Sequence, residues 1–228
     1  MHKVRLIFER QPLHLVSLII LLGLVLVGSF VGGFLTGSYF GVSTSVWFYI
    51  AIVVPIAHQV FVWFVWRSQL YFSFITKIFG PAGFNYYAVI FFVLFLSRLV
   101  FIIILALSNA NSLHSNQLVL STLAVIIFIP NIFLLYSVAK YFGYKRALGI
   151  DHFDLSYRNM PLVKEGIYRI TNNAMYVFGL LILWIPGLLY SSIAALMAAL
   201  FNHIYVWVHY YCTEKPDMER IYGSRDNL

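Results

Sequence analysis

The chain has 228 residues, of which 61% are hydrophobic and only 10% are charged, with a net charge of +7. A soluble domain carries about 25% charged residues, so this composition excludes a soluble enzyme, a disordered chain and a nucleic-acid-binding domain. The single cysteine excludes an intrachain disulfide and a metal site built on several thiolates. We therefore expect an integral membrane protein without a metal site.

Apolar runs of about 20 residues mark the expected membrane-spanning helices. The first four are long, and only the third carries a formal charge, Arg98. A fifth and a sixth run are separated by one residue and predict a tight helical hairpin, in which Pro186 and Gly187 should bend or end the first helix. The predicted spans are residues 15–35, 46–65, 86–107, 118–138, 176–190 and 192–211.

The distribution of charge predicts the orientation. The odd-numbered connections, residues 36–45, 108–117 and 191, contain no Lys, Arg, Asp or Glu, whereas every Lys and Arg except Arg98 lies on the other side. The positive-inside rule then places both termini in the cytoplasm. This clean separation supports six crossings, so the predicted fold is an all-α, polytopic membrane protein with about six transmembrane helices.

The connection at residues 139–175 is too long for a simple turn and should have its own structure. It holds six basic and three acidic side chains together with many Tyr, Leu and Phe residues, and we expect it to form a cytosolic cap on the membrane face. The chain then divides into a four-helix region, residues 1–138, and a second region, residues 139–228. The second region contains the cap, the C-terminal hairpin and the tail.

Two polar stretches should form the walls of one pocket. The first is the end of the cap, residues 162–176, and the second is the exit of the sixth span, residues 209–218. Because spans five and six form a hairpin, both stretches lie at the cytosolic end. His203, Trp207, Tyr210 and Glu214 share one helical stripe on the sixth span. A stripe this polar should face protein or water rather than lipid.

These two stretches resemble the membrane methyltransferases, namely the isoprenylcysteine carboxyl methyltransferases and the phospholipid N-methyltransferases. The family signature is roughly L-V-x-x-G-x-Y-x-x-x-R-H-P-x-Y-x-G followed by E-E-x-x-L-x-x-x-F-G. It aligns with residues 162–176 and 214–223, and the resemblance covers about the last 85 residues. In this chain Asn172-Asn173-Ala174 stands in place of R-H-P, and Lys215 stands in place of the second Glu.

The resemblance implies S-adenosylmethionine bound on the cytosolic side and a lipophilic acceptor that enters from the bilayer. Glu214 would hold a polar end of the cofactor, since a carboxylate is a suitable partner for an ammonium group or for ribose hydroxyls. Carried over by position, the cofactor-binding residues are Leu162, Val163, Gly166, Tyr168, Arg169, Asn172, Asn173, Tyr176 and Glu214.

Methyl transfer from a sulfonium requires mainly positioning, and an amine acceptor must arrive unprotonated. The candidate catalytic residues are His152 and His209, which could handle a proton, and Arg98, which lies near mid-membrane. The asparagine-containing motif favours a phospholipid amine as the acceptor, as in phosphatidylethanolamine methyltransferases. Two alternatives stay open: a carboxyl O-methyltransferase of the isoprenylcysteine type, and a non-catalytic membrane protein that binds or transports lipid.

Overall fold

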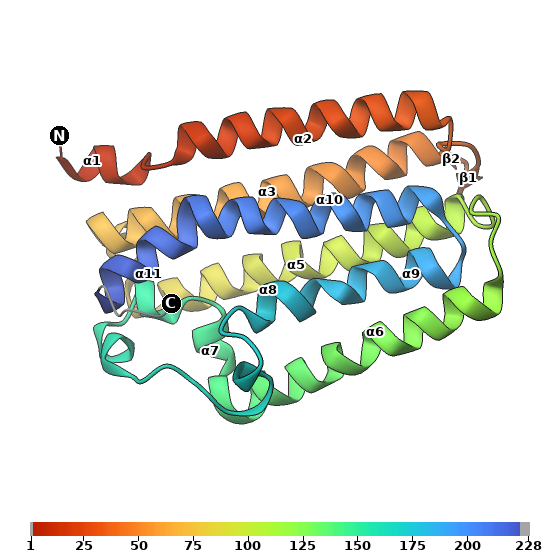
Figure 1. Cartoon of the computed structure of the whole chain (residues 1–228). Coiled ribbons are helices and arrows are strands. Elements are labelled where there is room, and N and C mark those ends of the chain that lie inside the picture. The colour runs from red at the N-terminus through yellow and green to blue at the C-terminus, as the bar shows by residue number, and fades with distance from the viewer. Residues whose placement is uncertain (1, 224–228) are drawn as a thin grey trace.

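The computed structural model describes residues 2–223, apart from the side chain of His2, as an elongated bundle of helices (Figure 1). Five helices in this range are long and apolar enough to cross a membrane, and a shorter apolar helix covers Ala174–Leu189. The predicted all-α polytopic membrane fold is confirmed. The α-helices are α1 (His2–Ile7), α2 (Gln11–Gly32), α3 (Thr44–Phe72), α4 (Phe74–Phe79), α5 (Gly83–Ser108), α6 (Gln117–Ser137), α7 (Tyr144–Ala147), α8 (Ala174–Phe178), α9 (Trp184–Leu189), α10 (Ile193–His209) and α11 (Lys215–Tyr222).

Irregular helical turns and one small strand pair complete the chain. Two π-helical turns, Val138–Phe142 and Tyr210–Glu214, extend α6 and α10. The strands β1 (Ser38–Tyr39) and β2 (Val42–Ser43) pair in antiparallel register. Short 3₁₀ helices are Gly80–Ala82, Ile150–His152, Leu155–Asn159, Gly166–Arg169 and Gly179–Leu183.

Helix α10 occupies the centre of the bundle, where it contacts α2, α3, α5 and α9. Helices α2 and α6 form two opposite outer edges (Figure 1). The amino-terminal helix α1, the cap and α11 gather at one end, and the two strands lie at the other end. An even number of passes through the bundle therefore brings both ends of the described chain to the same side.

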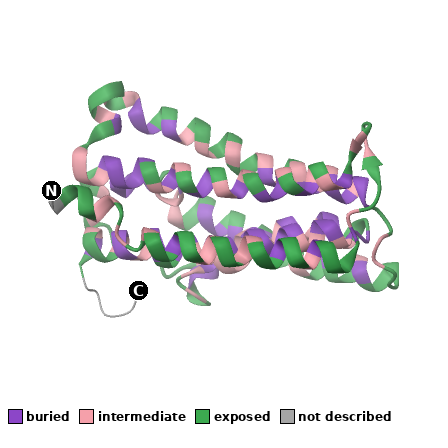
Figure 2. Ribbon diagram, turned by 90° about the horizontal axis from the view of Figure 1, so that it is seen from above, coloured by how far each residue is buried: buried purple, intermediate pink, exposed green. Residues whose placement is uncertain are grey.

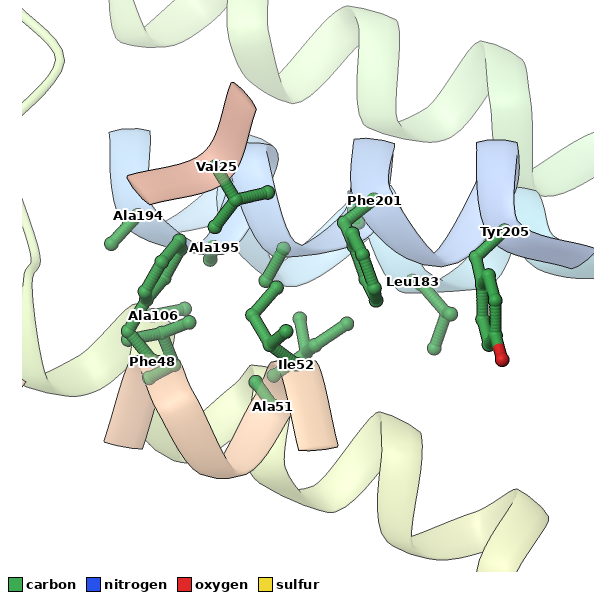
Figure 3. Packing of buried hydrophobic residues seen from close by; sticks show 14 of the residues in the cluster. Val25, Phe48, Ala51, Ile52, Ala106, Leu183, Ala194, Ala195, Phe201 and Tyr205 are labelled. Carbon is green, nitrogen blue, oxygen red and sulfur yellow. The ribbon is translucent and has the colours of Figure 1, made fainter. Parts of the chain in front are cut away.

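Alanines allow α10 to pack closely against its neighbours. Ala194, Ala195, Ala198 and Ala199 are fully buried, and Figure 3 shows Ala194 and Ala195 in the same cluster as Phe48 of α3. Small residues at helix contacts are typical of membrane proteins, because close backbone approach supplies the van der Waals contact that lipid tails would otherwise compete for. The core therefore joins both of the regions distinguished in the sequence.

The outward faces of the helices are apolar, as lipid contact requires. Figure 2 shows exposed residues running along the outer sides of the bundle and buried residues turned inward. Phe30 of α2 is 89% exposed and Leu118 of α6 is 76% exposed. Large exposed apolar surfaces mark sites of protein or membrane contact, and here they extend along the lengths of helices that are long enough to span a bilayer.

The fifth pass is irregular, but its irregular part is not where the sequence predicts it. Pro186 lies in the first turn of α9, and the helix continues past it to Leu189. The backbone before it, Gly179–Leu183, forms a 3₁₀ helix. Because proline has no N–H to donate to the preceding turn, the chain departs from α-helical hydrogen bonding on the amino-terminal side of Pro186.

Asn131 of α6 satisfies the backbone at the start of this irregular segment. Its side-chain nitrogen donates to the carbonyl oxygens of Phe178, at 3.1 Å, and Gly179, at 3.0 Å. Backbone groups that are free at membrane depth need such a partner, since no bulk water reaches them. Asn131 therefore ties α6 to the turn between α8 and the 3₁₀ segment.

We expect Asn131→Leu to lower the free energy of unfolding by about 1–3 kcal/mol, because two partly buried carbonyl groups lose their donor. The measurement is denaturant unfolding in detergent micelles. Thr122→Val on the same helix is the matched control, since the exposed Thr122 hydroxyl donates within its own helix, to the carbonyl oxygen of Leu118. An Asn131→Leu variant as stable as the control would show that the Asn131 hydrogen bonds to Phe178 and Gly179 do not stabilise the fold.

Candidate functional site

A cavity lies at the end of the bundle where the cap meets α8, the exit of α10 and α11. It combines apolar side chains, four tyrosines and both signs of charge, all from segments after residue 141. The lining residues are Phe142, Arg146, Asp151, Leu162, Val163, Tyr168, Asn172, Asn173, Met175, Tyr176, Tyr210, Glu214, Lys215, Met218 and Tyr222.

The hydroxyl of Tyr176 donates a hydrogen bond to the carboxylate of Glu214 and joins the two sides of the cavity. The Tyr176 ring packs against Tyr210, with ring centroids 4.9 Å apart, and against Trp207, at 5.5 Å. Trp184 of α9 donates to His203 of α10 further along the hairpin, at 3.2 Å. The polar stripe predicted on the sixth span thus faces the fifth pass.

The predicted stripe on the sixth span assumed a regular α-helix as far as Glu214, but the exit of α10 is irregular. The α-helix ends at His209, and the next residues, Tyr210–Glu214, form a π-helical turn. Such turns are rare and are frequent at functional sites. Here the turn carries Tyr210 and Glu214, and both of these residues line the cavity.

The structure brings together seven of the nine residues predicted to bind a cofactor. These residues are Leu162, Val163, Tyr168, Asn172, Asn173, Tyr176 and Glu214. Gly166 and Arg169 lie outside the lining. The Arg169 side chain is exposed, and Gly166 has a different structural task in the cap.

Gly166 allows the cap to dock against α6. Its φ of +61° is in the left-handed region, and a Cβ atom there would lie 2.5 Å from the Ser137 hydroxyl. The next backbone N–H, of Ile167, donates to that hydroxyl at 3.0 Å. A larger residue at position 166 would therefore push the cap away from α6, and with it the loop that carries Tyr168 into the cavity.

The three residues predicted to be catalytic all lie outside the cavity lining. His152 is buried in the cap and stacks on Trp66 of α3, with ring centroids 4.3 Å apart. His209 is buried with its ring 6.0 Å from that of Trp66. Arg98 is buried within α5, and its guanidinium lies 3.5 Å from the carbonyl oxygen of Pro55. A direct catalytic role for these residues stays a prediction.

Beside the cavity, and in part lining it, buried charged and polar groups connect α3, the cap and α11. Arg67 and Asp217 form an ion pair at 3.2 Å with both side chains fully buried. His152 lies between two carboxylates, with its Nδ1 3.1 Å from Asp151 and its Nε2 3.8 Å from Asp217. Tyr222 donates to the other oxygen of Asp151 at 2.8 Å. We refer to Arg67, Asp217, His152, Asp151 and Tyr222 as the buried charge network.

This network was not anticipated, because α3 is longer than the sequence predicts. The apolar run ends at residue 65, so Arg67 is expected in a connection, whereas α3 continues to Phe72 and buries it.

The sequence did contain a signal for two lining residues of the cavity that were not among the predicted site residues. Met218 and Tyr222 occupy the apolar and aromatic positions of the second signature motif, and both line the cavity.

Burial opposes charge on His152, but the neighbouring carboxylates of Asp151 and Asp217 more than offset this and raise the pKa of His152 from 6.5 to about 9. A raised pKa in the folded state contributes stability that is complete below pH 6.5 and is lost as the pH rises toward 9. We expect the stability of the protein to fall across this window. His152→Gln should flatten that fall, as measured by unfolding in detergent at stepped pH.

The control for this pH series is His114→Gln, because His114 is exposed at the opposite end of the bundle, among the residues near α6. This variant should keep the slope of the unmodified protein between pH 6.5 and 9. Equal slopes for His152→Gln and the unmodified protein would show that the buried imidazole does not carry the effect.

Together, the fold and the cavity define a helical membrane protein with a solvent-side pocket built by a cap and the last two passes. Residues 119–225 match the phospholipid methyltransferase family. The resemblance found in the sequence is confirmed for this part of the chain. Every residue that lines the cavity falls within the matched range.

One curated relative is a phosphatidylethanolamine N-methyltransferase from Talaromyces marneffei, to which this chain is 39% identical over 62 residues. The matched stretch is 27% of this chain and 6% of that protein. The chain therefore spans only a small part of the length of the relative. No solved structure matches the chain.

Proposed function

We propose that this protein transfers a methyl group from S-adenosylmethionine to the amine of a membrane phospholipid. The observation that carries the proposal is the Tyr176–Glu214 pair, which lies inside the cavity at the cap end of the bundle and inside the matched range. The relative named as a phosphatidylethanolamine N-methyltransferase supports the same choice of acceptor.

The cavity has the chemistry that this cofactor needs. Leu162 and Val163 offer an apolar wall for an adenine ring, and the tyrosines add aromatic faces. Glu214 can accept hydrogen bonds from an ammonium group or from ribose hydroxyls. Lys215 and Arg146 supply positive charge for a carboxylate. The residues present therefore fit S-adenosylmethionine, which would supply an activated methyl group there.

The protein's own contribution is mainly to position the reactants and to exclude water. Tyr176 orients the Glu214 carboxylate, and the packing of Tyr176 on Tyr210 and Trp207 holds that hydroxyl in place. An amine acceptor must lose a proton to become nucleophilic. The Glu214 carboxylate lines the cavity, so it is better placed to receive that proton than His152 or His209.

We also propose that the cap and both termini face the cytosol. The amino-terminal helix, the cap and α11 lie at one end of the bundle (Figure 1). The basic side chains outside the spans are concentrated in those segments, and the opposite connections carry none. The positive-inside rule assigns the basic end to the cytoplasmic side.

The test uses purified protein in vesicles of phosphatidylcholine with or without phosphatidylethanolamine, supplied with S-adenosylmethionine labelled in its methyl group. We expect label in the lipid fraction only when the amine lipid is present, in a form stable to base. Base-labile label in a prenylated cysteine substrate would instead identify a carboxyl O-methyltransferase. Saturable cofactor binding without transfer to either substrate would identify a non-catalytic protein.

A further inference from the structure

The cavity contains a second carboxylate that does not belong to either signature motif. Asp151 comes from the cap and lines the same cavity as Glu214, which comes from the exit of α10. Where the related enzymes have two consecutive Glu residues, this chain has Glu214 followed by Lys215. Asp151 thus restores, from a different element, a negative charge that the motif has lost.

The surroundings of Asp151 hold its carboxylate in a fixed position. His152 lies 3.1 Å from one oxygen, and the Tyr222 hydroxyl donates to the other at 2.8 Å. The Asp151 side chain is only 5% exposed. Burial opposes its charge, but the bonds from His152 and Tyr222 and the charge of His152 lower the pKa of Asp151 below its ordinary value. The group therefore presents a permanent negative charge to the cavity.

A second observation indicates that the cavity is shaped for a ligand. Tyr168 lines the cavity and is only 4% exposed. Its hydroxyl is buried without a hydrogen-bond partner in the described part of the chain. A buried hydroxyl without a partner costs free energy, and a bound molecule with polar groups in the cavity would remove that cost.

The two carboxylates suit different cations. Glu214 accepts a hydrogen bond from Tyr176 and keeps acceptor capacity for N–H donors. Both oxygens of Asp151 already have partners within the protein, so Asp151 acts chiefly as a fixed charge. A sulfonium has no N–H to donate and requires charge rather than a hydrogen-bond acceptor.

On the basis of the proposed function, we propose that Asp151 is a cofactor-binding residue that selects the sulfonium cation of S-adenosylmethionine over the uncharged thioether of S-adenosylhomocysteine. The methyl transfer removes the charge from sulfur, so the same contact favours the substrate form of the cofactor and weakens on the product form. This selection would assist product release without any movement of the cap.

The experiment compares the dissociation constants of both compounds, measured by calorimetry on the full chain in detergent. We expect Asp151→Asn to weaken S-adenosylmethionine binding by about tenfold or more, because the sulfonium loses a negatively charged partner. The same substitution should change S-adenosylhomocysteine binding by much less, because its thioether carries no charge. Asp154→Asn is the matched control, because Asp154 lies three positions along the same cap, accepts a hydrogen bond from the Ser156 backbone N–H and is not among the residues that line the cavity. This control should leave both constants unchanged.

The ratio of the two dissociation constants distinguishes selection for the sulfonium from a general loss of structure, since a distorted cap would weaken the binding of both compounds alike. An unchanged ratio in Asp151→Asn would overturn the proposal while leaving the proposed function intact. Failure of the unmodified protein to bind either compound would instead overturn the proposed function. Glu214→Gln should weaken the binding of both compounds by a similar factor and preserve the ratio of their dissociation constants.

If Asp151→Asn does not fold, the unmodified protein still tests the inference. It must bind S-adenosylmethionine more tightly than S-adenosylhomocysteine, and equal affinities would overturn the proposal. Tyr222→Phe removes one hydrogen bond to Asp151 but keeps its charge. This variant should retain the preference for the sulfonium, and loss of the preference there would count against a role for charge alone.

Discussion

Replacement of Glu214 by Gln is expected to weaken S-adenosylmethionine binding by about tenfold to a hundredfold, because a hydrogen bond to a charged group contributes about 1.5–3 kcal/mol. The substitution removes the charge but keeps the shape of the side chain. The Tyr176 hydroxyl can still donate to the amide oxygen, so the local fold should be preserved. Calorimetric titration in detergent measures the affinity, and labelled methyl transfer should fall in parallel.

The matched control is Glu219→Gln, since Glu219 is exposed on α11 and is not among the residues that line the cavity. It removes the same charge from the same end of the protein and should bind the cofactor like the unmodified chain. Tyr176→Phe keeps the carboxylate but frees it to reorient, and a smaller loss of affinity is expected. Undiminished binding by Glu214→Gln would mean that the carboxylate is only a surface charge at the end of a membrane helix.

Substitution of Asp217 by Asn should lower the free energy of unfolding by about 3–5 kcal/mol, because it leaves the buried charge of Arg67 without its counterion. Arg67 is fully buried, and the Asp217 carboxylate is the anion paired with it in the described chain. The other N–H groups of the Arg67 guanidinium already donate to the backbone carbonyls of Ile7, Glu9 and Cys212. The guanidinium therefore has few other partners that could compensate for the loss of the Asp217 charge.

The Arg220–Glu9 pair provides the comparison for this second prediction. Both of its side chains are partly exposed, at 32% and 34%, and exposed ion pairs contribute about 0–1 kcal/mol. Glu9→Gln should therefore cost much less than Asp217→Asn in the same denaturant titration. Equal costs for the two variants would show that the Arg67–Asp217 pair is no more important than a surface contact.

The position of the cavity could be predicted from the sequence because its main lining residues are close to one another along the chain or are separated by one hairpin. Tyr176 and Glu214 belong to two recognisable motifs, and the hairpin between them leaves few ways to arrange the ends. Gly166 and Arg169 belong to the same motif but do not reach the cavity. A motif preserves residues that shape a loop as well as residues that contact a ligand, and the spacing alone does not distinguish the two.

The sequence by itself determined the class of protein, the approximate places of the membrane passes and the separation of basic from uncharged ends. These are properties of composition and of contiguous runs, and the energetic cost of placing charge in lipid makes them readable without any knowledge of packing. The irregular fifth pass was only half visible: Pro186 indicates a break, but the sequence alone did not show that the helix would continue past it to Leu189.

Only the tertiary structure decided which charges meet. Arg67 and Asp217 are 150 positions apart, and Asp151 approaches Tyr222 across 71 positions. Neither pair has a local signal, since each depends on how far α3 extends, where the cap docks on α6 and how α11 turns back toward the cavity. Charged groups become buried partners when several elements close around them, and that closure is a property of the whole bundle rather than of any segment of the chain.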